Sequence, residues 1–453
     1  MRRDTMGGKR GDGNQRAERR RRADPRRIQV GKPDRSLTAV AGLVGFGVFL
    51  YTLGVDRELR ERFFKLKDGR RVIYPMEGQL RMLLDLFILG EQRVFGLEAA
   101  SGDPLFVHLC GGVVPSIDTV YRDLERFEDA DLVSLDEYLA EHAVAETRPL
   151  RLREVHLDID TTVETVFGTA EGALPGYNPR YPGRPCYHPI LGRIAENDMV
   201  IGARLRPGDT TFGDDDAPYV LELLRRTRKA VGPRCLVFVR IDAAGDCTEI
   251  MLGIDQAGST FLTKARMTQD LCAAVTLVTE WKTVDRDAFG TPTRQVAEVE
   301  FARKEWSQRG LKVRVIAVRS LERDNGKQLY LWNDMEYTVQ VFLSNDPNGE
   351  ADEIAHRYDK RAGIEPLIAE LKGAFGIGKI PSKDFHANHA AFLLKILAYN
   401  LLRRYVRATA SPLRRWRASW IRRVLIQVPG RLVRSGRRLT LRMAPRPAMP
   451  RLN

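Results

Sequence analysis

The chain has 453 residues, of which 43% are hydrophobic and 29% charged. This composition is typical of globular proteins and excludes collagen-like, coiled-coil and wholly disordered chains, and the length allows two or three domains. The net charge of +14 is concentrated at the two ends: residues 1–35 hold 13 basic and 5 acidic side chains, and residues 403–453 hold 15 Arg and no acid. Basic arms on an acidic body are typical of proteins that bind nucleic acid or an anionic membrane.

The two ends and the first apolar segment differ in pattern. Residues 1–36 are polar and Gly-rich without apolar periodicity, which predicts a disordered basic arm. Residues 37–55 contain no charge and are long enough to span a bilayer, but four of them are Gly, so we expect a buried helix and no membrane segment. Residues 403–453 interleave Trp and aliphatic side chains with arginines, which predicts a folded, helical basic tail.

Helical patterns extend from 37 to about 150. Pro115-Ser116 precedes a short helix that Ser116 or Asp118 can cap, and Val120, Leu124 and Phe127 recur on one face of it. Arg122 lies on another face. The pattern fits equally a recognition helix in a helix-turn-helix and a packing helix with a solvated basic face.

Strand patterns begin at 151. The segments EVHLDIDTTVETVFG and CLVFVRID (235–242) are typical of buried strands. Further alternating segments over 295–343, within a β-rich stretch of about 266–345, predict an antiparallel addition to the same sheet. Helical patterns resume near 352 and continue to 407. The chain is therefore predicted to be an α/β protein with a mixed-sheet domain over 151–402, preceded by a helical domain over 37–150.

Two of the predicted strands end in an aspartate. In HLDID, Asp158 and Asp160 share one face by the period of two, and in FVRID Arg240 and Asp242 share one face. Carboxylates at the ends of apolar strands are costly to desolvate, so they require a cation, a hydrogen-bond network or a metal. Capping of a loop is the other common role of such residues.

A third group of polar residues follows in YDKRAGIEPLIAELK (358–372). Tyr358, Arg361, Glu365 and Lys372 are spaced by 3, 4 and 7, which brings them to one face of a helix. Tyr, Arg and Lys bind phosphates, and Glu is a hard oxygen ligand. Two Asp and one Glu could together hold Mg²⁺ or Mn²⁺ for phosphodiester chemistry.

These residues resemble a known family. The spacing Y-x2-R-x3-E-x6-K, together with LDIDTT and GYNPRYPGRPCYHPIL (176–191), resembles the DDE transposases of the IS1380 group within the larger IS4-like set, over roughly 37–445. The resemblance implies an RNase H-like core with a β-rich insertion before the helix that carries Glu365. It also implies an enzyme that binds terminal inverted repeats and performs metal-dependent cleavage and strand transfer of DNA.

Carried over by position, the resemblance implies that Asp160, Asp242 and Glu365 are the catalytic, metal-binding carboxylates, with Asp158 as an alternate ligand. Tyr358, Arg361 and Lys372 would contact the DNA backbone. Trp281, Trp306 and Trp332 lie in the β-rich stretch, where one tryptophan could stack on a flipped base or could instead fill the sheet surface, and the polar context LWND favours Trp332 for stacking. The resemblance further implies double-stranded DNA as partner, a homodimer on DNA, and a cytoplasmic, nucleoid-associated protein.

One residue departs from a simple helical reading of the signature. Pro366 follows Glu365 directly and cannot donate its backbone N–H, so we expect the helix to begin at Pro366 with Glu365 at its cap. This position keeps a second function open, namely a catalytically decayed or regulatory DNA-binding protein on a transposase scaffold.

Overall fold

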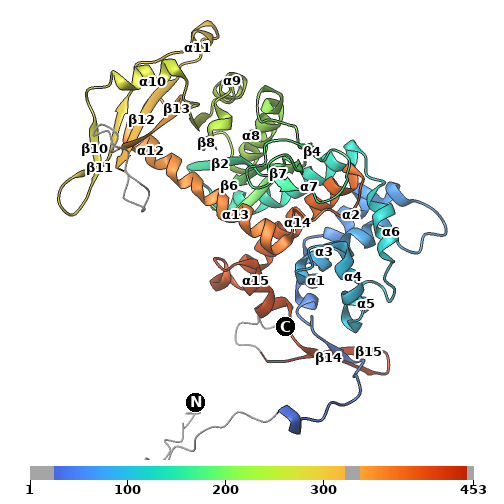
Figure 1. The fold of residues 1–453 in the computed structure, drawn as a ribbon. Coiled ribbons are helices and arrows are strands. Elements are labelled where there is room, and N and C mark those ends of the chain that lie inside the picture. The colour runs from blue at the N-terminus through green and yellow to red at the C-terminus, as the bar shows by residue number, and fades with distance from the viewer. Residues whose placement is uncertain (1–24, 322–336, 446–453) are drawn as a thin grey trace, which may run out of the picture.

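The computed structural model describes residues 25–321 and 337–445. Within these ranges, the largest sheet has nine strands in the order β10-β11-β12-β13-β9-β8-β2-β6-β7 (Figure 1). Its strands are β2 (Glu154–Thr161), β6 (Ile190–Ile194), β7 (Met199–Arg204), β8 (Leu236–Ile241), β9 (Thr260–Lys264), β10 (Lys282–Arg286), β11 (Pro292–Glu298), β12 (Arg314–Leu321) and β13 (Tyr337–Ser344). The sheet is mixed, as the sequence predicts.

The parallel part of the sheet is built around β2. β8 pairs with β2 in parallel and β9 pairs with β8 in parallel, whereas β6 and β7 add to the other side of β2 in antiparallel fashion. Val155, Leu157 and Ile159 of β2 are fully buried in the apolar cluster that includes residues of the helices α7 (Asp129–Thr147) and α8 (Ala217–Val231). Because side chains alternate along a strand, Asp158 and Asp160 emerge on the opposite face.

The strands β10 to β13 form an antiparallel meander that joins the parallel part through the pair β13–β9. They lie within the predicted range 266–345 and continue the same sheet. Two short helices belong to this stretch, α10 (Gln269–Thr276) and α11 (Lys304–Gln308). The expected antiparallel addition is therefore present.

Helices cover both faces of the sheet. α7, α8 and α9 (Thr248–Gln256) contribute to the apolar cluster beneath β2 and β8. On the other face, α12 (Ala351–Asp359) packs Ile354 and Ala355 against β9, β11, β12 and β13. α13 (Ile364–Glu370) follows α12 after a 3-10 turn over 360–363, and the two helices run together from the meander toward α14 (Figure 1). This helical run carries the signature residues.

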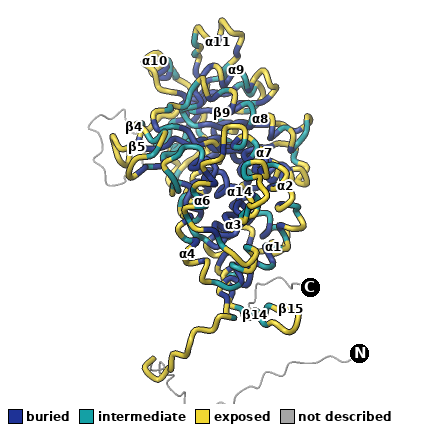
Figure 2. The backbone as a smooth tube through the Cα atoms, turned by 90° about the vertical axis from the view of Figure 1, so that its right-hand side faces the viewer, coloured by how far each residue is buried: buried dark blue, intermediate teal, exposed yellow. Residues whose placement is uncertain are grey.

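The N-terminal helices surround α14 (Phe385–Thr409), whose residues from Ala387 to Leu402 are all buried. They are α1 (Leu43–Thr52), α2 (Val55–Phe63), α3 (Met76–Leu89), α4 (Leu97–Ala100), α5 (Pro104–Leu109) and α6 (Ile117–Leu124). α3 and α14 form the buried centre of this part (Figure 2). α1 covers only part of the apolar segment 37–55, and none of the helices in the described residues is long and apolar enough to cross a bilayer.

The C-terminal arm differs from the helical tail that the sequence predicts. α14 continues past residue 402 to Thr409, and a short helix α15 (Ala418–Ile421) follows. The chain then forms a hairpin of β14 (Gly430–Ser435) and β15 (Arg438–Met443), which lies outside the main body (Figure 2). The alternating RLVRSGRRLTLRM pattern explains the hairpin, since its turn contains Gly436 at φ 59°.

The two basic ends of the chain meet at this hairpin. β1 (Leu37–Thr38) pairs with β14, and Arg431 forms an ion pair with Asp34 at 2.6 Å. The prediction of a disordered arm falls on residues 1–24, which lie outside the described residues, and on 25–36, which are mostly exposed. The part of the N-terminal arm next to β1 is thus attached to the C-terminal hairpin.

His389 on α14 gives the fold a predicted sensitivity to acid. Its Nε2 accepts a hydrogen bond from the backbone N–H of Leu205 at 3.1 Å, and burial lowers its pKa to about 3. Since the unfolded pKa is about 6.5, this contribution is complete above pH 6.5 and is lost as the pH falls below it, by about 2 kcal/mol at pH 5. Urea unfolding at pH 7 and pH 5 measures the loss.

The control for this prediction is His389→Gln, because a Gln oxygen can accept from the same N–H and does not titrate in this range. The variant should lose less stability between pH 7 and pH 5 than the native chain. Equal losses in the two proteins would assign the acid sensitivity to other groups.

Candidate active site

Asp160 and Asp242 lie side by side at the ends of two adjacent parallel strands. In the pairing of β2 with β8, Asp158 is opposite Arg240, and each of the two aspartates lies two residues further along. Asp242 caps the turn after β8, where its side chain accepts from the N–H of Ala244 at 2.9 Å. The sequence prediction that the two strands end in aspartates therefore gives a pair of neighbouring carboxylates.

The pair is electrostatically strained without a cation. The side chain of Asp160 is 14% exposed, and burial raises its pKa to about 6, with the negative charge of Asp242 contributing in the same direction. Arg361 opposes this shift, since its Nη2 lies 3.0 Å from Oδ1 of Asp160. Burial alone would lower the pKa of Arg361, but Asp160 and the other nearby anionic groups raise it overall.

Arg361 and Tyr358 come from the helical run that crosses this edge of the sheet. Tyr358 packs on Phe342 of β13 with ring centroids 4.5 Å apart, and burial raises the pKa of its phenol to about 12. Arg361 is 7% exposed. Both residues lie within electrostatic range of Asp160 and Asp242, so the signature and the two strand-end aspartates meet in one place.

Glu365 is the second residue of α13, which begins at Ile364. The expected start at Pro366 is therefore two residues late: helical geometry continues through Pro366, and the 3-10 turn over 360–363 precedes it directly. A proline within the first turn of a helix removes only an N–H that has no partner there. The Glu365 side chain is exposed, and α13 contacts β2.

Lys372 reaches a carboxylate that the sequence analysis did not single out. Its Nζ donates to the carbonyl of Val163 at 2.8 Å and lies 3.2 Å from Oε1 of Glu164. Glu164 begins β3 (Glu164–Thr165) in a small sheet with β4 (Leu174–Pro175) and β5 (Pro185–Tyr187), and burial raises its pKa. Lys372 thus holds the loop that follows Asp160.

Asp158 is committed to a structural ion pair. It is fully buried, accepts from Nε of Arg240 at 2.6 Å, and lies 3.7 Å from Nε of Arg193. Arg240 in turn donates to the carbonyl of Arg357 at 2.7 Å, which ties β8 to α12. Asp160 is also paired, with Arg361, but its side chain is 14% exposed whereas Asp158 is fully enclosed, so Asp160 is the more accessible of the two carboxylates.

The donor chemistry at this edge fits a divalent cation at the two aspartates. Asp160 and Asp242 offer hard oxygen ligands, and the raised pKa of Asp160 reflects a buried negative charge that a cation would stabilise. Within the described residues, no group of three or more His, Cys, Asp and Glu side chains is gathered closely enough to hold a metal. Glu365 lies on α13 and is not gathered with the two aspartates in the described structure.

Of the two other predicted DNA-contacting residues, only Arg122 lies in the described part of the chain, and it belongs to the N-terminal helical part. Arg122 is exposed on α6, where the Ser116 side chain accepts from Thr119 N–H as the predicted cap and Val120, Leu124 and Phe127 are buried. The choice between a recognition helix and a packing helix stays open. Trp332 lies outside the described residues.

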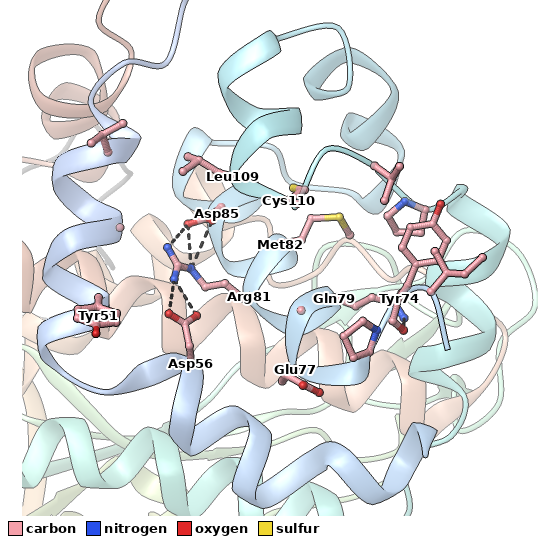
Figure 3. A pocket seen from close by; sticks show the side chains of 18 of the residues that line it. Tyr51, Asp56, Tyr74, Glu77, Gln79, Arg81, Met82, Asp85, Leu109 and Cys110 are labelled. Atoms are coloured by element: carbon pink, nitrogen blue, oxygen red, sulfur yellow. Dashed lines mark hydrogen bonds and ion pairs between the residues drawn. The ribbon is translucent and has the colours of Figure 1, made fainter. Parts of the chain in front are cut away.

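A cavity of about 760 Å³ in the N-terminal helical part holds none of the predicted site residues (Figure 3). Its charged groups are already paired: Arg81 lies 2.9 Å from Asp56 and 3.4 Å from Asp85, and Glu77 lies 4.0 Å from Arg60 of α2. Burial raises the pKa of Asp85. Because these charges are already matched within α2 and α3, we place the candidate active site at the edge of the sheet.

Comparisons with known proteins show which family the chain resembles. No curated protein matches the chain. The cryo-EM structure of a piggyBac transposase synaptic complex with hairpin DNA is similar over 85% of this chain and 79% of that chain, with a TM-score of 0.46 and 11% sequence identity. A model of the family described as "Transposase DDE domain group 1" matches residues 21–451. Since this match spans nearly the whole chain, including both strand-end aspartates and the Tyr-Arg-Glu-Lys helix, the chain belongs to that family of DDE transposases.

Proposed function

We propose that the chain is the transposase of an insertion sequence of the IS1380 group, which binds terminal inverted repeats and carries out cut-and-paste cleavage and strand transfer. The observation that carries the proposal is the placement of Asp160 and Asp242 on adjacent parallel strands under the helical run that bears Tyr358, Arg361 and Glu365. The strand order β7-β6-β2-β8-β9, with β6 and β7 antiparallel and β8 and β9 parallel, supports an RNase H-like core.

Asp160 and Asp242 would hold Mg²⁺ or Mn²⁺, and Glu365 would complete the ligand set from α13. When bound, such ions supply a Lewis acid that activates water or a 3′-hydroxyl and stabilises the leaving oxygen of a phosphodiester. Arg361 holds Asp160 in place and compensates its charge in the free protein. We propose that Arg361, together with Tyr358 and Lys372, would contact the DNA backbone when Asp160 serves as a metal ligand.

The activity is tested with purified protein and a labelled duplex that carries the sequence flanking its own gene. We expect cleavage at the repeat boundary only with Mg²⁺ or Mn²⁺, and no cleavage by Asp242→Asn or Glu365→Gln, although both variants should still bind the duplex. Sequence-selective binding without cleavage in either metal would contradict the proposal and favour the decayed or regulatory protein. Cleavage by Glu365→Gln at the native rate would remove Glu365 from the ligand set.

The C-terminal hairpin is the basic surface that we propose to contact DNA. Arg434, Arg437, Arg438 and Arg442 are exposed, and no ion pair involves them in the described part of the chain. By contrast, Arg422 and Ile421 are buried, and Arg422 donates to the carbonyls of Phe87, Ile88 and Ala374. Deleting 403–453 would therefore disrupt the core, so the arm is tested by substitution.

Replacing these four hairpin arginines by Gln should weaken duplex binding and its dependence on salt. Each phosphate contact contributes about 0.9 to the slope of log affinity against log salt, so the slope should fall by up to about 3.6. Anisotropy titrations between 50 and 200 mM salt measure it, with urea unfolding as the control for stability. An unchanged slope would show that the hairpin does not contact phosphate.

A further inference from the structure

A second cavity lies against α13, on a face of the helix different from the one that carries the signature. It has a volume of about 500 Å³, and from this helical segment it is lined by Gly363, Leu367 and Glu370, whereas Arg361, Glu365 and Lys372 do not line it. Its other wall is formed by the end of α14 and by residues 415–419 at α15. Figure 1 shows α15 beside the region where α13 leads into α14.

The cavity has an excess of positive charge. Four arginines line it, Arg193, Arg403, Arg415 and Arg417, against the two acids Asp198 and Glu370. Glu370 is compensated by Arg403, whose Nη2 lies 2.6 Å from its Oε2. Arg415 and Arg417 are exposed and have no ion pair within the described residues. The uncompensated positive charge favours binding of an anion in the cavity.

Arg193 provides the strongest indication of that anion. It is 5% exposed, and its Nε and Nη1 are buried without a hydrogen-bond partner. The nearest carboxylates are too far for good hydrogen bonds: Asp158 is 3.7 Å from Nε and is already bound to Arg240, and Asp198 is 3.5 Å from Nη2. Buried N–H groups left without an acceptor are costly.

The surroundings hold Arg193 toward the cavity. A Cβ atom on Gly363 would come within 2.8 Å of Nη2 of Arg193, so a glycine is what lets the guanidinium lie against the helical run. Arg403, which also lines the cavity, has a buried Nε without a partner. A phosphate group can accept several hydrogen bonds from guanidinium N–H groups at once, because the planar fork of an arginine matches its oxygens.

Trp416 extends the site from phosphate to nucleotide. It lines the cavity with 43% of its surface exposed, and its carbonyl accepts from Nη1 of Arg403 at 2.7 Å, which fixes the backbone at this point. An exposed indole between two free arginines is a stacking surface for a base, and stacking requires that the base be unpaired.

We propose that this cavity binds one unpaired nucleotide of the substrate DNA, with its phosphate on Arg193 and Arg403 and its base on Trp416. The inference rests on the proposed function and deepens it, because α13 would carry Glu365 on one face and hold the substrate strand on another. Arg193 belongs to β6, the strand next to β2, so the same nucleotide would be positioned relative to Asp160.

The experiment compares Trp416→Ala with Trp420→Ala. Trp420 is also exposed, at 55%, and lies four residues further on, but it does not line the cavity and is stacked by Arg423. Anisotropy titrations use a single-stranded 10-mer, a blunt duplex and a duplex with a short single-stranded end. Trp416→Ala should lose roughly tenfold in affinity for the two probes with unpaired bases and little for the blunt duplex, within the range known for base stacking. Trp420→Ala should match the native chain.

Arg193→Gln tests the phosphate contact, and Arg417→Gln tests the positive charge that lines the cavity next to Trp416. Arg417 is at the surface, so its variant stays informative if Arg193→Gln lowers stability in urea unfolding. Each should weaken binding of the 10-mer several-fold. Equal affinities of the native, Trp416→Ala and Arg417→Gln chains for the 10-mer would overturn the proposed nucleotide site. Cleavage at the repeat boundary by the native chain would still support the proposed function, so the two proposals can fail separately. If millimolar inorganic phosphate alone displaced the 10-mer, the cavity would be a general anion site. That result would overturn the proposal that it binds a nucleotide.

Discussion

Replacing Asp160 by Asn should abolish DNA cleavage without lowering the stability of the fold. Loss of one of two neighbouring carboxylates removes a ligand for the divalent cation, and the rate should fall by roughly 10³-fold or more. Because burial raises the pKa of Asp160 to about 6, the ionised carboxylate is unfavourable in the folded state at neutral pH. Urea unfolding at pH 7 should therefore give a midpoint equal to or above that of the native chain.

Cleavage rate and stability should both be measured on Asp160→Asn, because the substitution also changes the surroundings of Arg361. Arg361 loses its contact with Asp160, but Asp242 and Asp158 still raise the pKa of its guanidinium, so its charge stays compensated. Binding of the terminal duplex should be retained. A variant that cleaves DNA at more than a tenth of the native rate would exclude Asp160 as a metal ligand.

Replacing Asp158 by Asn should have the opposite effect, although the two residues share one face of one strand. Asp158 is fully buried and is the partner of Arg240, which is itself 1% exposed. The variant leaves a buried guanidinium without its counter-charge, which costs about 3–5 kcal/mol. The free energy of unfolding from urea titration at pH 7 measures this loss.

The folded fraction of Asp158→Asn should still cleave DNA. Its rate per folded molecule, measured at a temperature where the variant is folded, is expected within a few-fold of the native rate. Complete loss of cleavage in a variant of native stability would instead place Asp158 in the chemistry, as the alternate ligand that the sequence left open.

Periodicity along the chain identified most of the elements that build the candidate site. The alternation in EVHLDID and FVRID predicts strands with aspartates at their ends, and the structure places these strands next to each other in parallel. The signature spacing predicts a common helical face, and Tyr358 and Arg361 indeed lie at the aspartates. The effect of Pro366 was overestimated, because a proline in a first turn is accommodated by a preceding 3-10 turn.

Other features depend on partners that are distant in sequence. Glu164 becomes a neighbour of the site through Lys372, 208 positions later, and Arg193 keeps N–H groups without a hydrogen-bond partner because Asp158 is hydrogen-bonded to Arg240. The prediction of a helical tail is wrong over β14 and β15. There the alternating pattern and the glycine turn favour a hairpin, and β1 pairs with one edge of it. The partners in each of these contacts are far apart in the sequence, so local patterns cannot predict that they meet.

By itself, the sequence determined the elements whose physical cause is local: the buried strands, the cap at Ser116, the helical character of 351–375 and the carboxylates that each element carries. The tertiary structure decided which of those carboxylates is fully enclosed in a structural ion pair and which keeps part of its side chain exposed at the edge of the sheet. Asp158 and Asp160 have the same residue type, strand and face, and they differ only in what surrounds them, Arg240 and Arg193 for one and Asp242 and Arg361 for the other. Charge compensation is a property of packing between strands and helices, so it distinguishes the structural aspartate from the chemical one where the sequence pattern treats them alike.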